Sequence, residues 1–270
     1  MDNSTMFWEG GFKNPPLPYW IASTPETNYP VLETSIKVDA AIVGGGITGI
    51  TTAFLLKQEG LSVAVIEKGR ILKGTTGHTT AKVTSQHSLI YYKLKKQFGN
   101  EKARQYAEAN ESAIDIIEEF IKQNNIECDF HRCPAYVYTL QDKYIKKIED
   151  EIKVAQELGI EASHHSEIPL PFEVKSAMRF DKQARFHPRK YLLSLAGKIP
   201  GDGSHIFEQT KAVDIENSTD LSVVTENGRK ITASNIIIAS HYPFYDGYGL
   251  YFTRLYPERS YIMAVKIKEK

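Results

Sequence analysis

The sequence is poor in cysteine, has no long apolar run and carries no excess of charge, and each scarcity excludes a class of protein. Two cysteines in 270 residues exclude a disulfide-stapled scaffold and favour a reducing compartment, so we expect a cytoplasmic protein. No apolar run approaches the roughly 20 residues that cross a bilayer, so we expect no membrane partner. Basic and acidic residues balance at 33 each, which argues against nucleic acid as a partner.

The N-terminal region lacks the features of a signal peptide and of a long helix. Residues 1–6 have neither a basic segment nor an apolar core, so we expect no signal peptide. Proline is dense between residues 7 and 37 and prevents a long helix, so we expect an extended arm there. Tyr19 and Trp20 are the residues that we expect to anchor this arm on the core.

What is present is a pattern of strand, glycine turn, helix, strand and acid between Val38 and Glu67. The segments follow in this order: a β-branched apolar run at 38–43, a glycine-rich turn at 44–49, a helical run at 50–56 that stops at Gly60, and an apolar run at 61–66. This order is the dinucleotide-binding fingerprint in the context that it requires. The alternative, a glycine-rich loop that only joins packed elements, needs both strands, the helix and the acid to coincide by chance.

Each part of this fingerprint has a physical role in holding a dinucleotide. The first glycine permits the tight turn, the second lets the backbone approach a pyrophosphate, and the third lets the helix pack closely on the strand. The helix N-terminus offers N–H groups and a partial positive charge to the phosphates. The acid accepts the ribose hydroxyls, which disfavours NADP. The candidate contacts are Gly44, Gly46, Ile47, Thr48, Gly49 and Glu67.

The stretch after Glu67 distinguishes between NAD and FAD. A simple NAD domain usually begins its next helix soon after the acid, whereas residues 69–82 form an extended segment rich in hydroxyl side chains. Such a segment can return to the pyrophosphate and run along a flavin. It therefore favours FAD as the cofactor, and it argues against a module whose flavin site has lapsed.

From residue 38 to residue 82 the chain resembles the FAD-dependent glycine oxidase and D-amino acid oxidase family. Within that family it looks closest to bacterial members that carry a Rieske iron–sulfur domain at the C-terminus. The resemblance continues in order to about Val265, through the segments 99–104, 126–130 and 186–192. It implies an α/β fold: a Rossmann-like FAD-binding domain of the glutathione-reductase type with an inserted, incomplete α+β substrate domain.

The resemblance also implies how the chain divides into domains. An extended arm at 1–37 precedes the first part of the FAD-binding domain at 38–127 and the first part of the substrate domain at 128–179. The second part of the FAD-binding domain is 180–243, and 244–270 begins the rest of the substrate domain. In the family, the arginine that binds the substrate carboxylate and the closing FAD segment lie further on. We therefore expect the chain to be a fragment of a longer oxidoreductase.

The same resemblance implies further cofactor contacts. The family positions that contact FAD without bonding to it correspond here to Lys68, Thr75, Thr76, Thr80, Ala81 and Lys82. The backbone at Val213 corresponds to an adenine contact. Ala239 and Ser240 match a second FAD motif, in which small residues let the cofactor lie close, and His241 stands where glycine is common.

His78 is the sharpest prediction for a single residue. The run Gly74–His78 resembles the G-[TS]-T-x-H run of dimethylglycine and sarcosine dehydrogenases, whose histidine is bonded covalently to the flavin. An imidazole nitrogen is a suitable nucleophile toward the flavin 8α carbon. Gly77 replaces an aromatic residue of that run, and Thr79 and Thr80 replace smaller ones. The alternatives, a non-covalent flavin contact or a hydrogen bond to a neighbouring group, stay open and are favoured.

No metal site is expected. Cys128, His131 and Cys133 lack the ligand pairing of zinc spacings and of a Rieske cluster, so we interpret the two thiols as ordinary strand cysteines. His164 and His165 are expected in a polar loop, where adjacent histidines are usually solvated.

Periodicity and turn residues predict the remaining elements. The expected helices cover 88–98, closed by Gly99, then 100–124 and 142–158. The expected strands are 136–138, 206–215, a hairpin of 221–225 with 230–232 across an Asn-Gly turn, and a buried parallel strand at 236–240. Arg254 and Arg259 are expected to be surface arginines in a loop, with anion binding as the alternative.

The function implied by the resemblance is oxidation of a small amine or amino acid by hydride transfer to flavin N5. No acid–base pair is required, because the flavin carries the chemistry, so the sequence assigns no catalytic residue. A first alternative is a flavin dehydrogenase that passes electrons to an iron–sulfur domain. A second is a non-catalytic nucleotide-binding module, and an NAD-only dehydrogenase is a weaker rival.

Overall fold

The computed structural model describes residues 17–217, 220–245, 249–256 and 258. Contacts divide the chain into two compact units. Unit 1 contains the residues up to Glu26 together with Leu72–Leu195, and unit 2 contains Thr27–Ile71 together with the residues from Ala196 onward. The functional domain boundaries given above stay a prediction.

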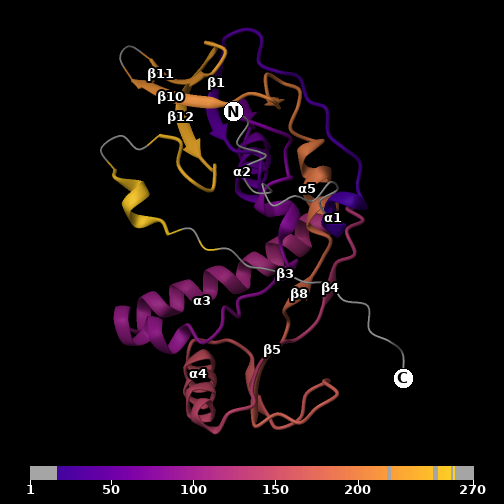
Figure 1. Cartoon of the computed structure of the whole chain (residues 1–270), viewed down its shortest axis with the longest axis vertical. Helices are drawn as coiled ribbons and strands as arrows, with labels where there is room; N and C mark the ends of the chain where they lie inside the picture. The colour runs from indigo at the N-terminus through magenta and orange to yellow at the C-terminus, as the bar shows by residue number, and fades with distance from the viewer. Residues whose placement is uncertain (1–16, 218–219, 246–248, 257, 259–270) are drawn as a thin grey trace, which may run out of the picture. The chain divides into compact units, whose positions relative to one another are not determined.

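Unit 2 is built on a six-stranded sheet whose centre is parallel (Figure 1). In spatial order the strands are β10 (Ala212–Asn217), β11 (Leu221–Thr225), β12 (Lys230–Ile238), β1 (Ile36–Val43), β2 (Val63–Ile66) and β9 (His205–Phe207). Strand β1 pairs in parallel with both β12 and β2, and β9 pairs in parallel with β2. Strands β10 and β11 extend the sheet as an antiparallel edge.

The strand–turn–helix–strand pattern predicted for residues 38–66 is confirmed. All four residues of β2 are buried, and Val43 of β1 packs with Ala64 and Ile66 in one apolar cluster. Helix α2 (Ile47–Gln58) follows β1 after three glycines and buries Ile50, Ala53 and Phe54 among its residues. The β-branched runs form the sheet because both of their faces are covered.

Two strand predictions in unit 2 need correction. The single strand expected at 206–215 is two strands, β9 and β10, because the chain turns between them and Gln209 has a left-handed backbone with φ 50°. The predicted hairpin is confirmed, but its second strand and the expected parallel strand are one element, β12. The end of β12 is also less buried than expected, since Ile238 is 39% exposed.

Unit 1 contains a three-stranded antiparallel sheet covered by a helix. The strands in spatial order are β5 (Ala135–Thr139), β7 (Ser176–Phe180) and β6 (Ala162–His165). Helix α4 (Ile145–Glu157), preceded by the 3-10 turn η2 (Asp142–Tyr144), packs on this sheet. Met178 of β7 and Ile148 of α4 belong to the same buried cluster. The histidines at 164 and 165 therefore lie in strand β6, and their prediction as loop residues was wrong.

The long helix α3 (Tyr91–Gln123) carries the break that the sequence predicted. Gly99 has φ 83° and ψ 170°, which separates two helical stretches. The helix begins at Tyr91 instead of Ser88, whose own φ is 59°. The cause is Glu151 of α4, which is fully buried and accepts the backbone N–H groups of Tyr91 and Tyr92 at 2.7 and 2.8 Å. A carboxylate from another helix thus fixes where α3 starts.

A second small sheet and four short helices complete the described chain. The sheet consists of β3 (Lys82–Val83), β8 (Ala184–Arg185) and β4 (His131–Arg132), in that order. The helices are α1 (Tyr19–Ala22), η1 (Thr75–His78), α5 (Pro188–Ala196) and η3 (Tyr251–Arg254). Arg254 is exposed, and Arg259 lies outside the described residues. In the described part of the chain, no helix is long and apolar enough to cross a membrane.

Candidate functional site

The turn between β1 and α2 lies against the end of β12. Gly44 has φ 113°, a conformation that favours glycine, and a Cβ atom added to it would lie 2.4 Å from the carbonyl oxygen of Ala239. It would also lie 3.0 Å from the Cα atom of Ser240. The structure therefore brings together three of the predicted contacts, from segments almost 200 residues apart. The backbone can approach closely here because no side chain intervenes.

The start of α2 is shaped for an anion. A Cβ atom at Gly49 would lie 1.9 Å from the Gly44 carbonyl oxygen, so the helix can begin this close to β1 only with glycine at that position. Gly46 is the N-cap residue and brings no side chain to the helix end. The side chains of Ile47 and Thr48 are exposed beside it. The partial positive charge of the helix N-terminus suits a phosphate group.

Glu67 is held beside the same turn by two backbone hydrogen bonds. Its Oε2 atom accepts the N–H of Gly45 at 2.9 Å, and its Oε1 atom accepts the N–H of Gly69 at 3.0 Å. The carboxylate is half-buried at the end of β2, where the sequence placed a ribose-binding acid. Lys68 next to it is exposed. The turn has no room for a Cβ atom at Gly44 or Gly49, and no side chain caps the start of α2, so both features fit a pyrophosphate. The fixed carboxylate of Glu67 fits the ribose of FAD.

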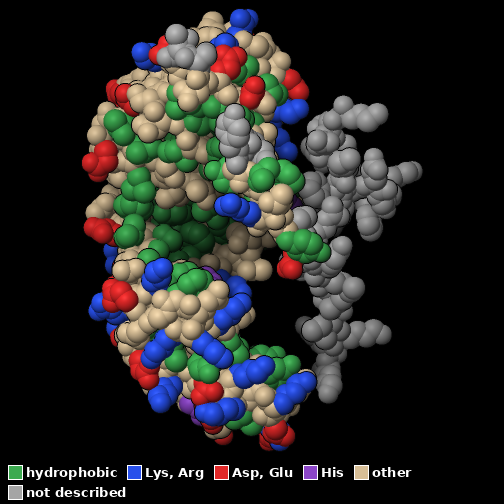
Figure 2. Space-filling view, turned by 90° about the vertical axis from the view of Figure 1, so that its left-hand side faces the viewer, with side chains coloured by type: hydrophobic (Ala, Val, Ile, Leu, Met, Phe, Trp, Pro, Cys, Tyr) green, Lys and Arg blue, Asp and Glu red, His purple; other side chains and the backbone are tan. Residues whose placement is uncertain are grey.

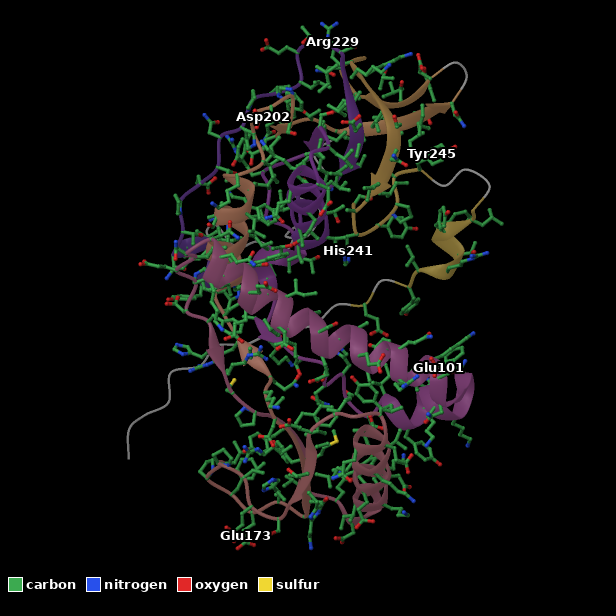
Figure 3. All side chains as sticks on the ribbon, turned by 180° about the vertical axis from the view of Figure 1, so that it is seen from behind. Glu101, Glu173, Asp202, Arg229, His241 and Tyr245 are labelled. Atoms are coloured by element: carbon green, nitrogen blue, oxygen red, sulfur yellow. The ribbon has the colours of Figure 1, made fainter. Side chains whose placement is uncertain are left out.

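Two more predicted positions of unit 2 have unusual backbones. The register of β10 against β11 shifts between Ala212 and Asp214, so Val213 forms a β-bulge on the edge strand and is 43% exposed. His241 follows β12 with φ 66° (Figure 3). This left-handed conformation explains why glycine is common there in the family, and His241 adopts it without being glycine.

The predicted contacts of unit 1 lie in and after the turn η1. Thr76 and Ala81 are buried, whereas the side chains of Thr75, Thr80 and Lys82 are exposed, as is that of His78. The His78 Nδ1 atom lies 2.8 Å from the carbonyl oxygen of Gly74. Because a carbonyl only accepts, Nδ1 carries the proton, and the lone pair of the neutral ring is on Nε2. Covalent attachment through His78 stays a prediction.

A cavity of about 570 Å³ opens beside Thr80 and Lys82 within unit 1. Its lining residues, mostly polar, are Thr80, Lys82, Thr84, Gln86, His87, Ser88, Tyr136 and Val137. His87 is oriented by a contact of 3.2 Å between its Nε2 atom and Asn110 Oδ1. Gln86, His87 and Tyr136 were not predicted as site residues. The polar run between β3 and α3 was the available signal for Gln86 and His87, whereas Tyr136 comes from strand β5.

The two cysteines belong to no metal-binding group in the described residues. Cys128 is buried beside β4, and burial raises the pKa of its thiol to about 11, so it is a protonated core residue. Cys133 is half-buried in the link between β4 and β5. Both cysteines were predicted to lie in strands, and this prediction was wrong, because each lies just outside β4. Among residues 17–217, 220–245, 249–256 and 258, no His, Cys, Asp and Glu gather as a metal-binding group. Figure 2 shows basic and acidic side chains interspersed on the face in view.

The fold and the glycine turn of unit 2 define a dinucleotide-binding protein of the Rossmann-like type. The sequence profile of the family described as FAD dependent oxidoreductase matches residues 39–270. The chain belongs to this family, whose cofactor is FAD. The predicted family, fold class and cofactor are thereby confirmed.

Two curated relatives place the chain more narrowly. The protein YhfW of Bacillus subtilis, named as a Rieske 2Fe-2S iron-sulfur protein, is 43% identical over 256 residues, which are 95% of this chain and 50% of that protein. The gamma-glutamylputrescine oxidoreductase of Escherichia coli is 25% identical over 219 residues, 79% of this chain and 51% of that protein. The chain thus spans about half the length of the curated relatives it matches.

Solved structures share the fold at low sequence identity. The glycine oxidase from Geobacillus kaustophilus superposes with a TM-score of 0.59 at 20% identity, over 76% of this chain and 55% of that one. The L-proline dehydrogenase from P. horikoshii superposes with a TM-score of 0.61 at 19% identity, over 76% of this chain and 53% of that one. At this identity, the likeness supports the fold and leaves the substrate open.

Proposed function

We propose that the protein to which this chain belongs oxidises a small amine or amino acid with FAD as its redox cofactor. The observation that carries the proposal is the closed approach of Gly44 to Ala239 beside the start of α2, in a chain of the FAD dependent oxidoreductase family. When bound, FAD supplies the redox chemistry by accepting a hydride at N5 from the carbon that bears the amine.

The residues of the chain bind and orient the reactants. The start of α2 holds the pyrophosphate, Glu67 accepts the ribose hydroxyls, and the segment 75–82 contacts the flavin. The cavity beside Lys82 has a volume in the range of small-molecule sites and receives the substrate. Among the described residues that line the cavity, Lys82 is the only permanently charged side chain, so it attracts an anionic group such as a carboxylate.

A test of this proposal is the response of the flavin spectrum of the full-length protein to candidate substrates without oxygen. We expect an amino acid or a primary or secondary amine to bleach the flavin band near ~450 nm. Lys82→Met, which keeps a long side chain without the charge, should raise the concentration needed more for amino acids than for amines without a carboxylate. A holoprotein that no amine or amino acid reduces would contradict the proposal and favour a non-catalytic module.

The second candidate function is a dehydrogenase that passes electrons from the flavin to an iron–sulfur domain. It is favoured by the relative YhfW, which is named as a Rieske protein and matches 95% of this chain. Oxygen consumption distinguishes the two candidates. An oxidase consumes oxygen during turnover, whereas the dehydrogenase turns over with an added one-electron acceptor and consumes little oxygen.

A cytoplasmic location stays part of the proposal, based on the two free cysteines among the described residues.

A further inference from the structure

A single helical turn of the N-terminal arm packs on the segment that carries the predicted flavin contacts of unit 1. Trp20 of α1 donates its indole Nε1–H to the carbonyl oxygen of Thr79 at 2.7 Å. Thr79 lies between His78 and Thr80, which are both predicted to contact FAD. The indole also packs edge-on against His187, with the ring centroids 4.8 Å apart. The arm is therefore bonded to the backbone in the middle of the predicted contact segment.

Ile21, the next residue, explains why position 77 is glycine. A Cβ atom at Gly77 would lie 2.8 Å from Ile21 Cδ1, 3.0 Å from Ile21 Cγ1 and 3.0 Å from the Leu72 carbonyl oxygen. Gly77 is buried, and no positive φ requires glycine there. The space beside Gly77 is filled by the side chain of Ile21. Ile21 therefore supplies an apolar side chain beside a position of η1 that has none of its own.

The arm is fastened on both sides of this contact. On the N-terminal side of η1, Lys73 Nζ forms an ion pair with Glu26 Oε1 at 2.5 Å. Ser23 Oγ lies 3.0 Å from His187 Nε2, while His187 Nδ1 accepts the backbone N–H of Lys190 at 3.2 Å. His187 is 1% exposed, and burial lowers the pKa of its imidazole, so it serves as a neutral, fixed support. Arg189 donates to the carbonyl oxygen of Pro25 at 2.8 Å.

The turn η1 is a single 3-10 turn of four residues. Its contacts within the segment include Gly77 N–H to Gly74 O at 3.0 Å and the His78 imidazole to the same oxygen. A single 3-10 turn of this kind is unstable without tertiary contacts. Its conformation, and with it the direction of His78 and Thr75, therefore depends on what packs against it.

We propose that residues 19–26 form a clip that shapes η1 for the cofactor, with Trp20 and Ile21 as positioning residues for FAD binding. This inference rests on the proposed FAD site and adds the arm to it. A merely structural anchor would stabilise the fold without changing FAD affinity. A positioning clip changes FAD affinity in variants that remain folded, and its effect depends on the fit between positions 21 and 77.

The experiment is a mutant cycle on the full-length protein, stripped of flavin and titrated with FAD, with flavin fluorescence as the readout. The variants are Gly77→Ala, Ile21→Ala and the double variant. Gly74→Ala is the control, because its Cβ atom would meet nothing within 4 Å. Trp20→Phe tests the indole N–H while keeping an aromatic ring. Thermal unfolding of each apoprotein reports the structural contribution separately.

We expect Gly77→Ala to weaken FAD binding about tenfold and Trp20→Phe about fivefold, the effect of one hydrogen bond. The double variant should bind more tightly than Gly77→Ala alone, because Ile21→Ala vacates the space that the new methyl group needs. Gly74→Ala should bind as the wild type does. An unchanged FAD affinity in Gly77→Ala and Trp20→Phe, or a double variant no better than Gly77→Ala, would overturn the clip alone. A wild-type protein that binds no FAD would overturn the proposed function as well.

Discussion

The turn between β1 and α2 and the segment 75–82 receive their shapes from different sources. In the turn, Gly49 lies against the carbonyl oxygen of Gly44, and the Glu67 carboxylate accepts the N–H of Gly45, so these contacts join residues within some twenty positions of one another. The end of β12 is the distant partner named above. The segment 75–82 instead packs against Trp20 and Ile21. The difference teaches that one predicted contact segment is shaped mainly by its own motif, whereas the other depends on contacts with residues distant in the sequence.

The comparison has an energetic consequence. Backbone-to-backbone closeness in the turn leaves no room for relaxation, so single substitutions there should have large effects. The contacts around η1 involve side chains that can move, so substitutions there should have moderate effects that depend on the partner.

Gly49→Ala should have the largest effect. The new Cβ atom would lie 1.9 Å from the carbonyl oxygen of Gly44, so the start of α2 must move away from β1. We expect a loss of about 3 kcal/mol in the free energy of unfolding, measured with urea, and no detectable FAD binding. Gly69→Ala is the matched control, because its Cβ atom would lie 3.8 Å from the Glu67 carboxylate. A Gly49→Ala variant as stable as this control would break the comparison.

Glu67→Gln should weaken FAD binding by about tenfold to a hundredfold. The change removes the charge that we propose binds the ribose hydroxyls, and it replaces one acceptor of the Gly45 and Gly69 N–H groups by an amide nitrogen. Isothermal titration of the apoprotein with FAD measures the loss. Glu59→Gln, in an exposed position at the end of α2, is the control and should have no effect. Equal FAD affinities for the two variants would show that Glu67 only supports the loop.

Glu151→Gln tests a remote contact in unit 1 and should cost about 1.5 kcal/mol of stability at neutral pH, because an amide oxygen cannot replace both acceptors of Tyr91 and Tyr92. Burial raises the pKa of the Glu151 carboxyl above its ordinary value in the folded protein. Protonation therefore favours the folded state, and this contribution is lost as the pH rises through the raised pKa. The stability difference between wild type and variant should widen as the pH falls towards 4.5. A difference that does not change with pH would argue against the raised pKa.

His78→Ala should have the smallest effect. The imidazole makes one exposed hydrogen bond to Gly74, so we expect a loss of about 0.5 kcal/mol and a change in FAD affinity of roughly two- to threefold. Acid precipitation of the wild type should release the flavin into the supernatant. Flavin retained in the wild-type pellet and released from His78→Ala would show a covalent bond and would reverse the ranking of the two regions.

The predictability of each region from the sequence follows from the range of its contacts. The β1–α2–β2 unit could be predicted because its glycines, apolar runs and acid are local requirements of one motif. The start of α3 could not, since it is set by Glu151 some 60 residues away. The prediction of a single strand at 206–215 was wrong because the chain breaks at Gln209, where no glycine or proline signals a turn. The cavity beside Lys82 was missed because Tyr136 comes from a separate strand.

We propose that the glycine turn of unit 2 holds FAD. The most direct test is the visible absorption spectrum of the full-length wild type and of Gly49→Ala, each purified after incubation with excess FAD. We expect flavin bands near ~370 and ~450 nm in the wild type and in Gly69→Ala, and none in Gly49→Ala. A wild type that stays colourless, or a Gly49→Ala variant that folds and keeps its flavin, would contradict it.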